Sequence, residues 1–412
     1  MRLIVVLAAL MMSSVQSVCA FEDEGVHTAL PALDTAALEK VEISLVTCEP
    51  YNQVYSLYGH TGLRINDPEH GIDALANWGI FELKQRFFVL RFTFGLTDYR
   101  MEIEPWLEFC ERYRYYGCGI QEQVLNLKAD EKMKLIAAVA ENYKPENRYY
   151  RYNYFYDNCT TRARDVVEQS VDGKIVYNNT EEPKSFRHLI HEWNGGHLWA
   201  RWGNDILLGV KADRKVTTRE SQFLPYNLLH DFDKARIVSK GEADRKLVTA
   251  TRWALPSAYV QTEPSFADTW LLRPESVAVA YLLVLIAVIY IERKRNVRLW
   301  QFDAFVLAVT GILGLVLLAM VFSQHPTVSV NFQILVFNPL SLLWLRPIIK
   351  NLRQRKPSPY LNYLALLTFI GVVLGLFFQR YAEGVGLLAI FLLETYMRRS
   401  GLSKDETKKE TK

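Results

Sequence analysis

Long apolar stretches fill the C-terminal part of this 412-residue chain and constrain its fold more than any other feature. They alternate with short basic connectors and lie at about residues 277–291, 302–322, 328–349, 361–378 and 385–396. A stretch of roughly 20 apolar residues can cross the hydrocarbon core of a bilayer. The pattern therefore predicts an all-α bundle of about five transmembrane helices over residues 271–400. Within the third stretch, Asn331, Gln333, Asn338 and Pro339 predict a broken or partly re-entrant segment.

The connectors predict the orientation of the bundle. Segments 292–300 and 350–360 and the tail from Arg398 are rich in Lys and Arg, whereas 323–329 has neither and 379–384 has only Arg380. Basic loops stay on the cytoplasmic side of a membrane. With five spans, the C-terminal tail 401–412 is then cytoplasmic and the region before Val277 lies outside the cytoplasm.

The N-terminus predicts the same placement, because residues 1–20 resemble a secretory signal. Arg2 is followed by the apolar run Leu3–Met12 and then by Val18-Cys19-Ala20. We expect cleavage after Ala20, with a lipoprotein site at Cys19 or a retained anchor as the alternatives. Residues 21–270 would then form an extracytoplasmic catalytic domain.

Composition excludes several classes of function. A formal net charge of +3 is too small to indicate a nucleic-acid partner, and the chain has no Gly-rich phosphate loop and no CxxC pair. His188, His191 and His197 lack an acidic residue at a metal-binding spacing. We therefore expect no cofactor and no metal.

Residues 21–270 show an α+β pattern. Predicted strands lie at 41–47, 60–65 and 74–81, with a strand-like aromatic run at 152–156, and predicted helices lie at 105–115, 130–143 and 160–169.

Cys159 is the sharpest chemical feature, because it directly precedes the predicted helix that begins at Thr160. Asp157 or Asn158 can cap that helix. Unpaired N–H groups at a helix start lower the pKa of a thiol and so favour the reactive thiolate. We predict that Cys159 is a catalytic nucleophile; the alternative is a disulfide or a buried structural cysteine.

His60 opens a predicted strand after Tyr58-Gly59 and is the expected general base for Cys159. A polar side chain should orient its other ring nitrogen. Asn77 is the first choice if the two strands pair, and Asp73 is the second.

The remaining cysteines leave the pairing open. Without the signal peptide the chain has Cys48, Cys110, Cys118 and Cys159. Cys110 and Cys118 are close enough in sequence to bridge, and a Cys48–Cys159 disulfide is an alternative.

Several strings resemble the Lnb-type lipoprotein N-acyltransferase family over nearly the whole mature chain. The two specific ones are LYGHTGLR at 57–64 and YDNCTTRARD at 156–165. Weaker matches are Phe223-Leu224-Pro225, His325-Pro326-Thr327, Asn331 and Asn338-Pro339-Leu340. Gly62 departs from the family pattern, in which Ala is expected.

The resemblance implies a permuted papain-like domain of the NlpC/P60 or LRAT type, held in the periplasm by a multi-pass anchor in the bacterial inner membrane. It implies that Cys159 takes an acyl chain from a membrane phospholipid as a thioester. The N-terminal amine of a diacylglyceryl-cysteine lipoprotein would accept that chain. His325, on the same side of the membrane, is a candidate for lining a lipid entry site, and the alternative is a loop histidine capped by Pro326.

Arg162 and Arg164 follow the nucleophile and are candidates for binding a phosphate head group, with pairing to acidic residues as the alternative. Two other functions stay open. One is a membrane-anchored cysteine peptidase or amidase acting on cell-wall peptide, and the other is a receptor or scaffold in which Cys159 is structural.

Overall fold

The computed structural model describes residues 35–51, 53–81, 86–258 and 273–401. All of them belong to one compact unit that begins at Asp34. The predicted signal peptide, its cleavage after Ala20 and the predicted cytoplasmic tail beyond residue 401 lie outside the described residues.

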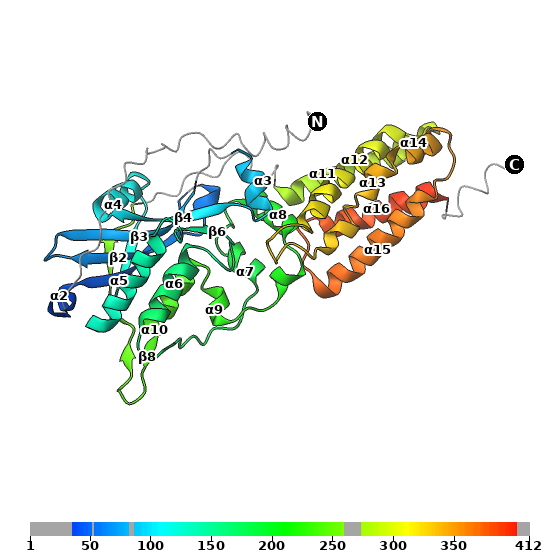
Figure 1. Cartoon of the computed structure of the whole chain (residues 1–412). Coiled ribbons are helices and arrows are strands. Elements are labelled where there is room, and N and C mark those ends of the chain that lie inside the picture. The colour runs from blue at the N-terminus through cyan, green and yellow to red at the C-terminus, as the bar shows by residue number, and fades with distance from the viewer. Residues whose placement is uncertain (1–34, 52, 82–85, 259–272, 402–412) are drawn as a thin grey trace. The chain divides into compact units, whose positions relative to one another are not determined.

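A seven-stranded antiparallel sheet forms the framework of the N-terminal domain, in the order β10-β5-β1-β2-β3-β4-β6 (Figure 1). The strands are β1 (Glu42–Cys48), β2 (His60–Asp67), β3 (Ile72–Ile80), β4 (Asp98–Pro105), β5 (Ile120–Leu125), β6 (Tyr149–Arg151) and β10 (Val248–Leu255). Strands β2 and β3 are neighbours, with Gly62 opposite Asn77. This confirms the pairing on which the assignment of Asn77 depends.

Helices cover both faces of the sheet. Helix α4 (Trp106–Tyr115) packs on one face through Phe109 and Tyr113, together with Val46 and Leu75 of the strands. The other face carries α5 (Ala129–Tyr143), α6 (Cys159–Ser170) and α10 (Pro225–Lys234), and Figure 1 shows them opposite α4. Because alternate residues of a strand point to opposite faces, burial of nearly every residue of β1 follows from this double cover.

The strand-like run at 152–156 is not a strand, so this prediction was wrong. Strand β6 ends at Arg151, and the chain then turns, with the Asp157 N–H donating to the Asn153 carbonyl at 2.9 Å. The aromatic side chains that suggested a strand serve tertiary packing instead: Phe155 is buried against Phe186 and Phe223. An alternating aromatic pattern reports burial, and burial is not specific to strands.

Shorter elements complete this domain. They are α2 (Thr35–Lys40), η1 (Val54–Ser56), α3 (Phe88–Thr93), α7 (Phe186–His191), α8 (Leu198–Leu207), η2 (Val210–Asp213), α9 (Thr218–Ser221) and a three-stranded sheet of β7 (Lys174–Val176), β8 (Arg236–Val238) and β9 (Arg245–Lys246).

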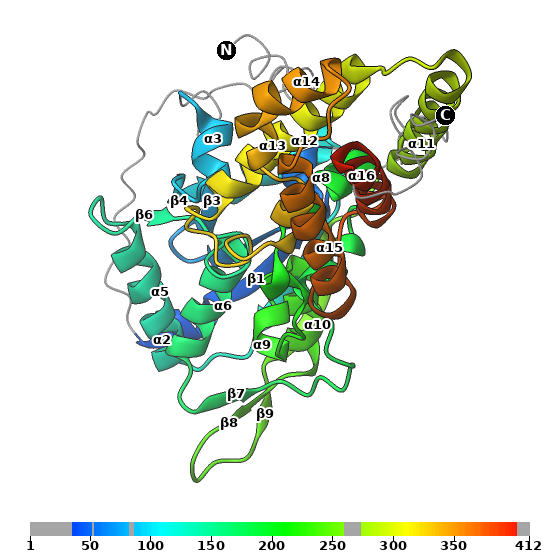
Figure 2. The same cartoon turned by 90° about the vertical axis from the view of Figure 1, so that its right-hand side faces the viewer.

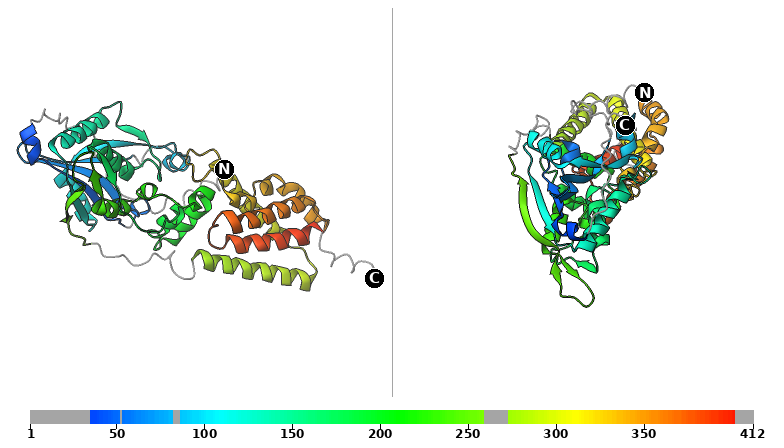
Figure 3. Two further views of the ribbon diagram at one scale, coloured as in Figure 1. Left: turned by 90° about the horizontal axis from the view of Figure 1, so that it is seen from below. Right: turned by 60° about the vertical axis from the view of Figure 1, so that its left-hand side comes forward.

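Helices fill the described part of the chain beyond residue 273. Three of them are long and apolar enough to cross a membrane: α11 (Pro274–Arg295), α12 (Trp300–Met320) and α15 (Tyr360–Phe378). Figures 2 and 3 show these helices with α16 (Val385–Ser400), which packs beside α15. At 16 residues, α16 is shorter than a full span.

The third apolar stretch is broken, as predicted. It forms η5 (Phe332–Leu335), α13 (Leu340–Leu343) and α14 (Leu345–Arg353). The chain bends by 72° between the first part, Phe332–Leu343, and the second part, Leu345–Arg353. If the bent pair counts as one span, the described residues contain up to four candidate spans rather than five.

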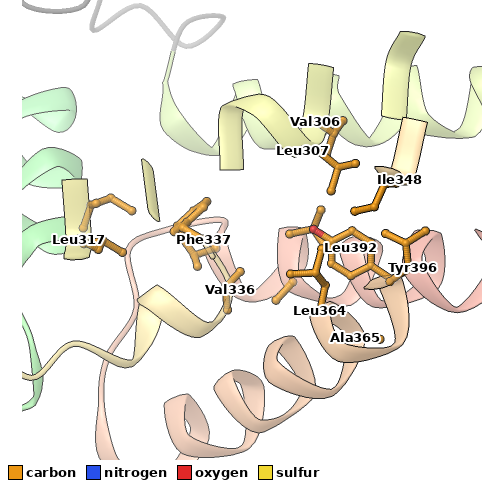
Figure 4. Close-up of a cluster of buried hydrophobic side chains, with 14 of the residues drawn as sticks. Val306, Leu307, Leu317, Val336, Phe337, Ile348, Leu364, Ala365, Leu392 and Tyr396 are labelled. Carbon is orange, nitrogen blue, oxygen red and sulfur yellow. The ribbon is translucent and has the colours of Figure 1, made fainter. Parts of the chain in front are cut away.

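An apolar core holds these helices together (Figure 4). Val306 and Leu307 of α12 and Ile348 of α14 meet Leu392 and Tyr396 of α16 there. Two glycines let the broken segment approach α12 closely: a Cβ at Gly314 would lie 2.4 Å from the Phe337 carbonyl oxygen, and one at Gly311 would lie 2.6 Å from Leu342.

Buried amides account for the break. The Asn331 amide donates to the Ile206 carbonyl at 2.7 Å, and the Gln333 amide donates to the Asp205 carbonyl at 2.8 Å. Gln379 donates to Asn331 Oδ1 at 2.8 Å. Non-helical backbone at membrane depth is tolerated only where protein groups satisfy it. These side chains therefore bond the broken segment to the end of α8.

Candidate active site

Cys159 is the first residue of α6, and Asn158 is its N-cap. Asn158 Oδ1 accepts the N–H groups of Thr160 at 3.0 Å and Thr161 at 2.9 Å. The Asn158 amide donates to the carbonyls of Tyr154 and Phe223, each at 2.9 Å, so the cap is fixed from both sides. Of the two predicted caps, Asn158 holds the position, and the helix begins at Cys159, one residue earlier than predicted.

The structure brings His60 and Asn77 to Cys159. His60 Nε2 lies 2.8 Å from Asn77 Oδ1, and the imidazole forms a hydrogen bond with the Cys159 thiol. Asp73, the second choice for the orienting residue, instead accepts two hydrogen bonds from Arg64, each of 2.7 Å. Cys159, His60 and Asn77 thus lie in a row, which is the geometry that a cysteine nucleophile, its base and an orienting group require.

A second layer of polar groups fixes Asn77. Its Nδ2 donates to Glu104 Oε1 at 2.6 Å, and Arg112 pairs with the same carboxylate. Asn77 Oδ1 also accepts the Gly79 N–H at 2.8 Å. These contacts define which end of the amide faces His60. Sequence reasoning missed Glu104 because it lies 27 residues beyond Asn77, on the next strand of the sheet.

Gly79 makes room for the imidazole. A Cβ at this position would lie 2.5 Å from His60 Cε1, closer than real Cβ atoms approach. The glycine two residues after Asn77 was the available sequence signal, since a glycine inside a strand often marks a close approach.

Two threonines join the elements that carry Cys159 and His60. Thr160 Oγ1 lies 3.2 Å from Thr61 Oγ1, and both side chains are buried. The Thr61 N–H also donates to the Cys159 sulfur. The start of α6 is thus held against the start of β2, which keeps thiol and imidazole at a fixed separation.

The four described thiols differ in electrostatics. Burial raises the pKa of Cys48 well above its usual value and raises those of Cys110 and Cys118 to about 11. Burial also raises the pKa of Cys159, but the charge and hydrogen bond of His60 and the Thr61 N–H lower it to about 7. Only the Cys159 thiolate, among the described thiols, is favoured near neutral pH.

The pKa of His60 shifts in the opposite direction to that of Cys159. Burial lowers the pKa of the imidazole, but the Cys159 thiolate and the bonds to Cys159 and Asn77 raise it, and its net pKa lies above the usual value. The pair is therefore poised as thiolate and imidazolium.

All four described thiols are free. Neither the Cys110–Cys118 nor the Cys48–Cys159 disulfide is present. Cys110 and Cys118 instead belong to the apolar cluster under α4, and the Cys118 thiol approaches the carbonyls of Pro50 and Tyr116 at 3.6 Å.

The described contacts of the three predicted binding residues are made with other parts of the chain. Arg162 pairs with Asp157 through bonds of 2.6 and 2.9 Å and stacks on Tyr150. Arg164 is buried and donates to Asp165 and to the Arg219 carbonyl. The described contacts of both arginines fit the alternative, which is pairing with acidic residues.

His325 lies in the connector after α12. Its Nε2 is 2.9 Å from the Phe92 carbonyl of α3, and its ring packs near the Phe92 ring. Burial lowers the pKa of His325, although the bond to Phe92 opposes this. The neutral imidazole therefore donates to the carbonyl and fastens α3 to the connector.

Within the described ranges, no group of three or more His, Cys, Asp or Glu residues could hold a metal ion. His191, one of the three histidines weighed for a metal site, contacts Asp205 at 2.9 Å, and Arg187 pairs with the same carboxylate.

Comparison with protein families decides the relationship. Residues 30–192 match the Lnb N-terminal periplasmic domain, and residues 266–406 match the Lnb transmembrane domain, which that family model designates as having five helices. The chain belongs to the Lnb family. Neither a curated protein nor a solved structure matches the chain.

Membership of the Lnb family implies a lipoprotein-modifying enzyme in the membrane, with its N-terminal domain in the periplasm. The Lnb periplasmic match contains His60, Asn77 and Cys159, and the Lnb transmembrane match contains His325.

Proposed function

We propose that this Lnb-family protein is a lipoprotein N-acyltransferase that works through a Cys159 thioester. The observation that carries the proposal is the arrangement of Cys159 at the start of α6 with His60 and Asn77, inside the match to the Lnb periplasmic domain. The lowered pKa of Cys159 agrees with it. The sheet with α6 on one face supports a permuted papain-like fold for the domain.

In the first half-reaction the Cys159 thiolate attacks an ester carbonyl of a membrane phospholipid. A carbon–sulfur bond forms and the carbon–oxygen bond to the glycerol breaks. The His60 imidazolium gives its proton to the leaving alkoxide, which departs as a lysophospholipid.

In the second half-reaction the free α-amine of a diacylglyceryl-cysteine lipoprotein attacks the thioester carbonyl. A carbon–nitrogen bond forms, the carbon–sulfur bond breaks, and His60 takes the amine proton. The products are an N-acylated lipoprotein and the original thiolate–imidazolium pair.

Both steps place negative charge on the carbonyl oxygen and need a hydrogen-bond donor there. N–H groups at the start of a helix can serve as such donors. Asn158 occupies the N–H groups of Thr160 and Thr161. We therefore assign the backbone N–H of Cys159 itself to the oxyanion.

Membrane anchoring supports the choice of lipid substrates. Three described helices are long and apolar enough to span a bilayer, and the bent pair and α16 would complete the five spans that the family model designates. We propose a location in the bacterial inner membrane, with the catalytic domain in the periplasm and the C-terminus in the cytoplasm.

The test compares a lipoprotein from cells that make the wild-type chain with one from cells that make Cys159→Ala. We expect intact mass to show an added acyl group on the N-terminal amine only with the wild type, with Cys110→Ala as a matched thiol control. Equal N-acylation in both strains would overturn the proposal. Cleavage of cell-wall peptide without a fatty-acyl thioester would favour a peptidase or amidase instead.

A further inference from the structure

Helix α3 and its flanks carry an unusual set of exposed apolar side chains. Phe87 is 60% exposed, Leu90 is 57% exposed and Leu96 is 38% exposed. Phe87 also has a left-handed backbone, with φ of 60°, which is strained for an aromatic residue. Exposed apolar patches mark contacts with membranes or partners. Contact between this apolar surface and water is therefore unfavourable, and a membrane or a partner that covered it would stabilise it.

Hydrogen bonds tie α3 to the chain where it leaves α12. Ser323 Oγ donates to the Thr93 carbonyl at 3.0 Å, the Gln324 N–H donates to the Phe94 carbonyl at 2.9 Å, and His325 contacts the Phe92 carbonyl at 2.9 Å. Three bonds in consecutive residues fix the helix to this connector.

The neighbouring end of α12 is itself apolar and exposed. Val321 is 46% exposed and Phe322 is 76% exposed, directly before the connector begins. Because α12 is a candidate span, its end marks the level of a bilayer surface. The hydrogen bonds from the connector to the carbonyls of α3 therefore hold the exposed side chains of this helix near the level of that surface.

Behind α3 lies a closed circuit of aromatic rings. Phe88 and Phe92 of α3 are neighbours, Phe88 stacks on Phe81, and Phe81 stacks on Tyr99 with centroids 4.8 Å apart. Tyr99 stacks on Tyr152 at 4.0 Å, and Tyr152 lies 6.0 Å from Phe92. We call Phe81, Phe88, Phe92, Tyr99 and Tyr152 the aromatic circuit.

The far side of the aromatic circuit lies within electrostatic range of Cys159. Burial raises the pKa of Tyr99, and the charge of a Cys159 thiolate raises it further. Tyr152 is affected by the same thiolate, after burial and Tyr99. Apart from Tyr99, the members are only half-buried, so an apolar ligand can still cover them.

We propose that α3 is the lipid-access element of the enzyme: its exposed side lies among the outer-leaflet acyl chains, and the aromatic circuit guides one acyl chain of the donor phospholipid to Cys159. This inference rests on the proposed acyl transfer. It gives His325 the role of a positioning residue that holds α3.

The test uses full-length protein in phosphatidylethanolamine vesicles and measures acyl-thioester formation on Cys159 by mass spectrometry. Leu90→Gln should slow thioester formation about tenfold, since it removes one apolar side chain from contact with lipid. Leu107→Gln on α4, where Leu107 is 66% exposed, is the matched control and should change nothing.

A water-soluble ester, p-nitrophenyl acetate, separates access from chemistry because it does not come from the bilayer. We expect Leu90→Gln to react with it at the wild-type rate. Equal loss with both substrates would show a structural role and overturn the inference, as would wild-type thioester formation from vesicles. If Leu90→Gln slowed only the transfer of the acyl group from Cys159 to lipoprotein, α3 would serve the acceptor rather than the donor. That result would also overturn the inference.

A second measurement does not need catalysis. Cys159→Ala protein is irradiated in vesicles that contain a phospholipid with a diazirine in one acyl chain. Cross-links should map to residues 86–96 as well as to the bundle, and not to 106–115 of α4. Cross-links confined to 273–400 would overturn the inference. If wild-type protein forms no thioester and cells lacking it still N-acylate lipoprotein, the proposed function fails whatever the cross-links show.

Discussion

His60 Nε2 meets Asn77 Oδ1 at 2.8 Å, and this contact determines the tautomer of the imidazole. Asn77 Oδ1 can only accept, because Nδ2 of the same amide donates to Glu104 and the Gly79 N–H donates to Oδ1. Nε2 therefore carries a proton. The other ring nitrogen, Nδ1, is left to exchange a proton with Cys159.

Alkylation of Cys159 should rise with pH through about 7, because its pKa is lowered to about 7 and the thiolate is the reactive form. The rate of iodoacetamide labelling at Cys159, followed by peptide mass spectrometry, measures this. In His60→Ala the burial of the thiol is no longer opposed by the imidazole, so the midpoint should move above the usual pKa of a thiol. Cys110 and Cys118, with pKa raised to about 11, are internal controls that should stay unlabelled at pH 7. A midpoint unchanged by His60→Ala would contradict the pairing.

Asn77→Ala should reduce the rate of thioester formation roughly 10- to 100-fold, since the imidazole loses the group that orients it. The folded fraction should change little, because the substitution leaves Glu104 paired with Arg112. Single-turnover kinetics with a soluble ester measures the loss. Asn126→Ala, which removes an exposed amide bonded to the Lys246 carbonyl, is the control. Equal rates for Asn77→Ala and wild type would remove Asn77 from the site.

Gly79→Ala should abolish most activity without unfolding the domain. The new Cβ would meet His60 Cε1 at 2.5 Å, so the ring must move out of line with Asn77. The measurement is the pH profile of Cys159 alkylation, which should shift upward as in His60→Ala. Gly203→Ala is the control, because a Cβ there meets nothing within 4 Å. Retention of the wild-type profile by Gly79→Ala would show that the ring tolerates the methyl group.

Gln333→Leu should destabilise the protein by about 1–3 kcal/mol, because it removes the bonds to the Asp205 and Ile206 carbonyls and leaves the Ala382 N–H without its described partner. Thermal unfolding in detergent measures the change. Gln354→Leu makes the same chemical substitution at an exposed position and should leave the midpoint unchanged. Equal midpoints for both variants would mean that water replaces the lost bonds.

Local patterns in the sequence were enough to predict the strands that carry His60 and Asn77 and a helix start beside Cys159. The catalytic roles of these three residues stay predictions. Cys159 at a helix start and Asn77 in the neighbouring strand are features of short segments, and short segments follow local rules. The family resemblance is confirmed by matches to both Lnb domains.

Long-range contacts account for what the sequence could not predict. Glu104 and the Phe92 contact of His325 depend on which strands and connectors meet, and spacing along the chain does not encode that. The run at 152–156 misled for the same reason, since its aromatic residues pack against α7 and Phe223 rather than along a sheet. The roles of Arg162, Arg164 and His325 in binding substrate stay predictions.

At the ends of the helices α11, α12 and α16, buried ion pairs join distant parts of the chain. Glu292 of α11 pairs with Arg398 and Arg399 of α16, and Arg399 also pairs with Asp303 of α12. Because Arg399 lies 107 residues after Glu292, these pairs can form only once α16 has been synthesised. Until then Glu292 and Asp303 lack these partners, so the insertion machinery must hold or shield the first two helices until α16 arrives.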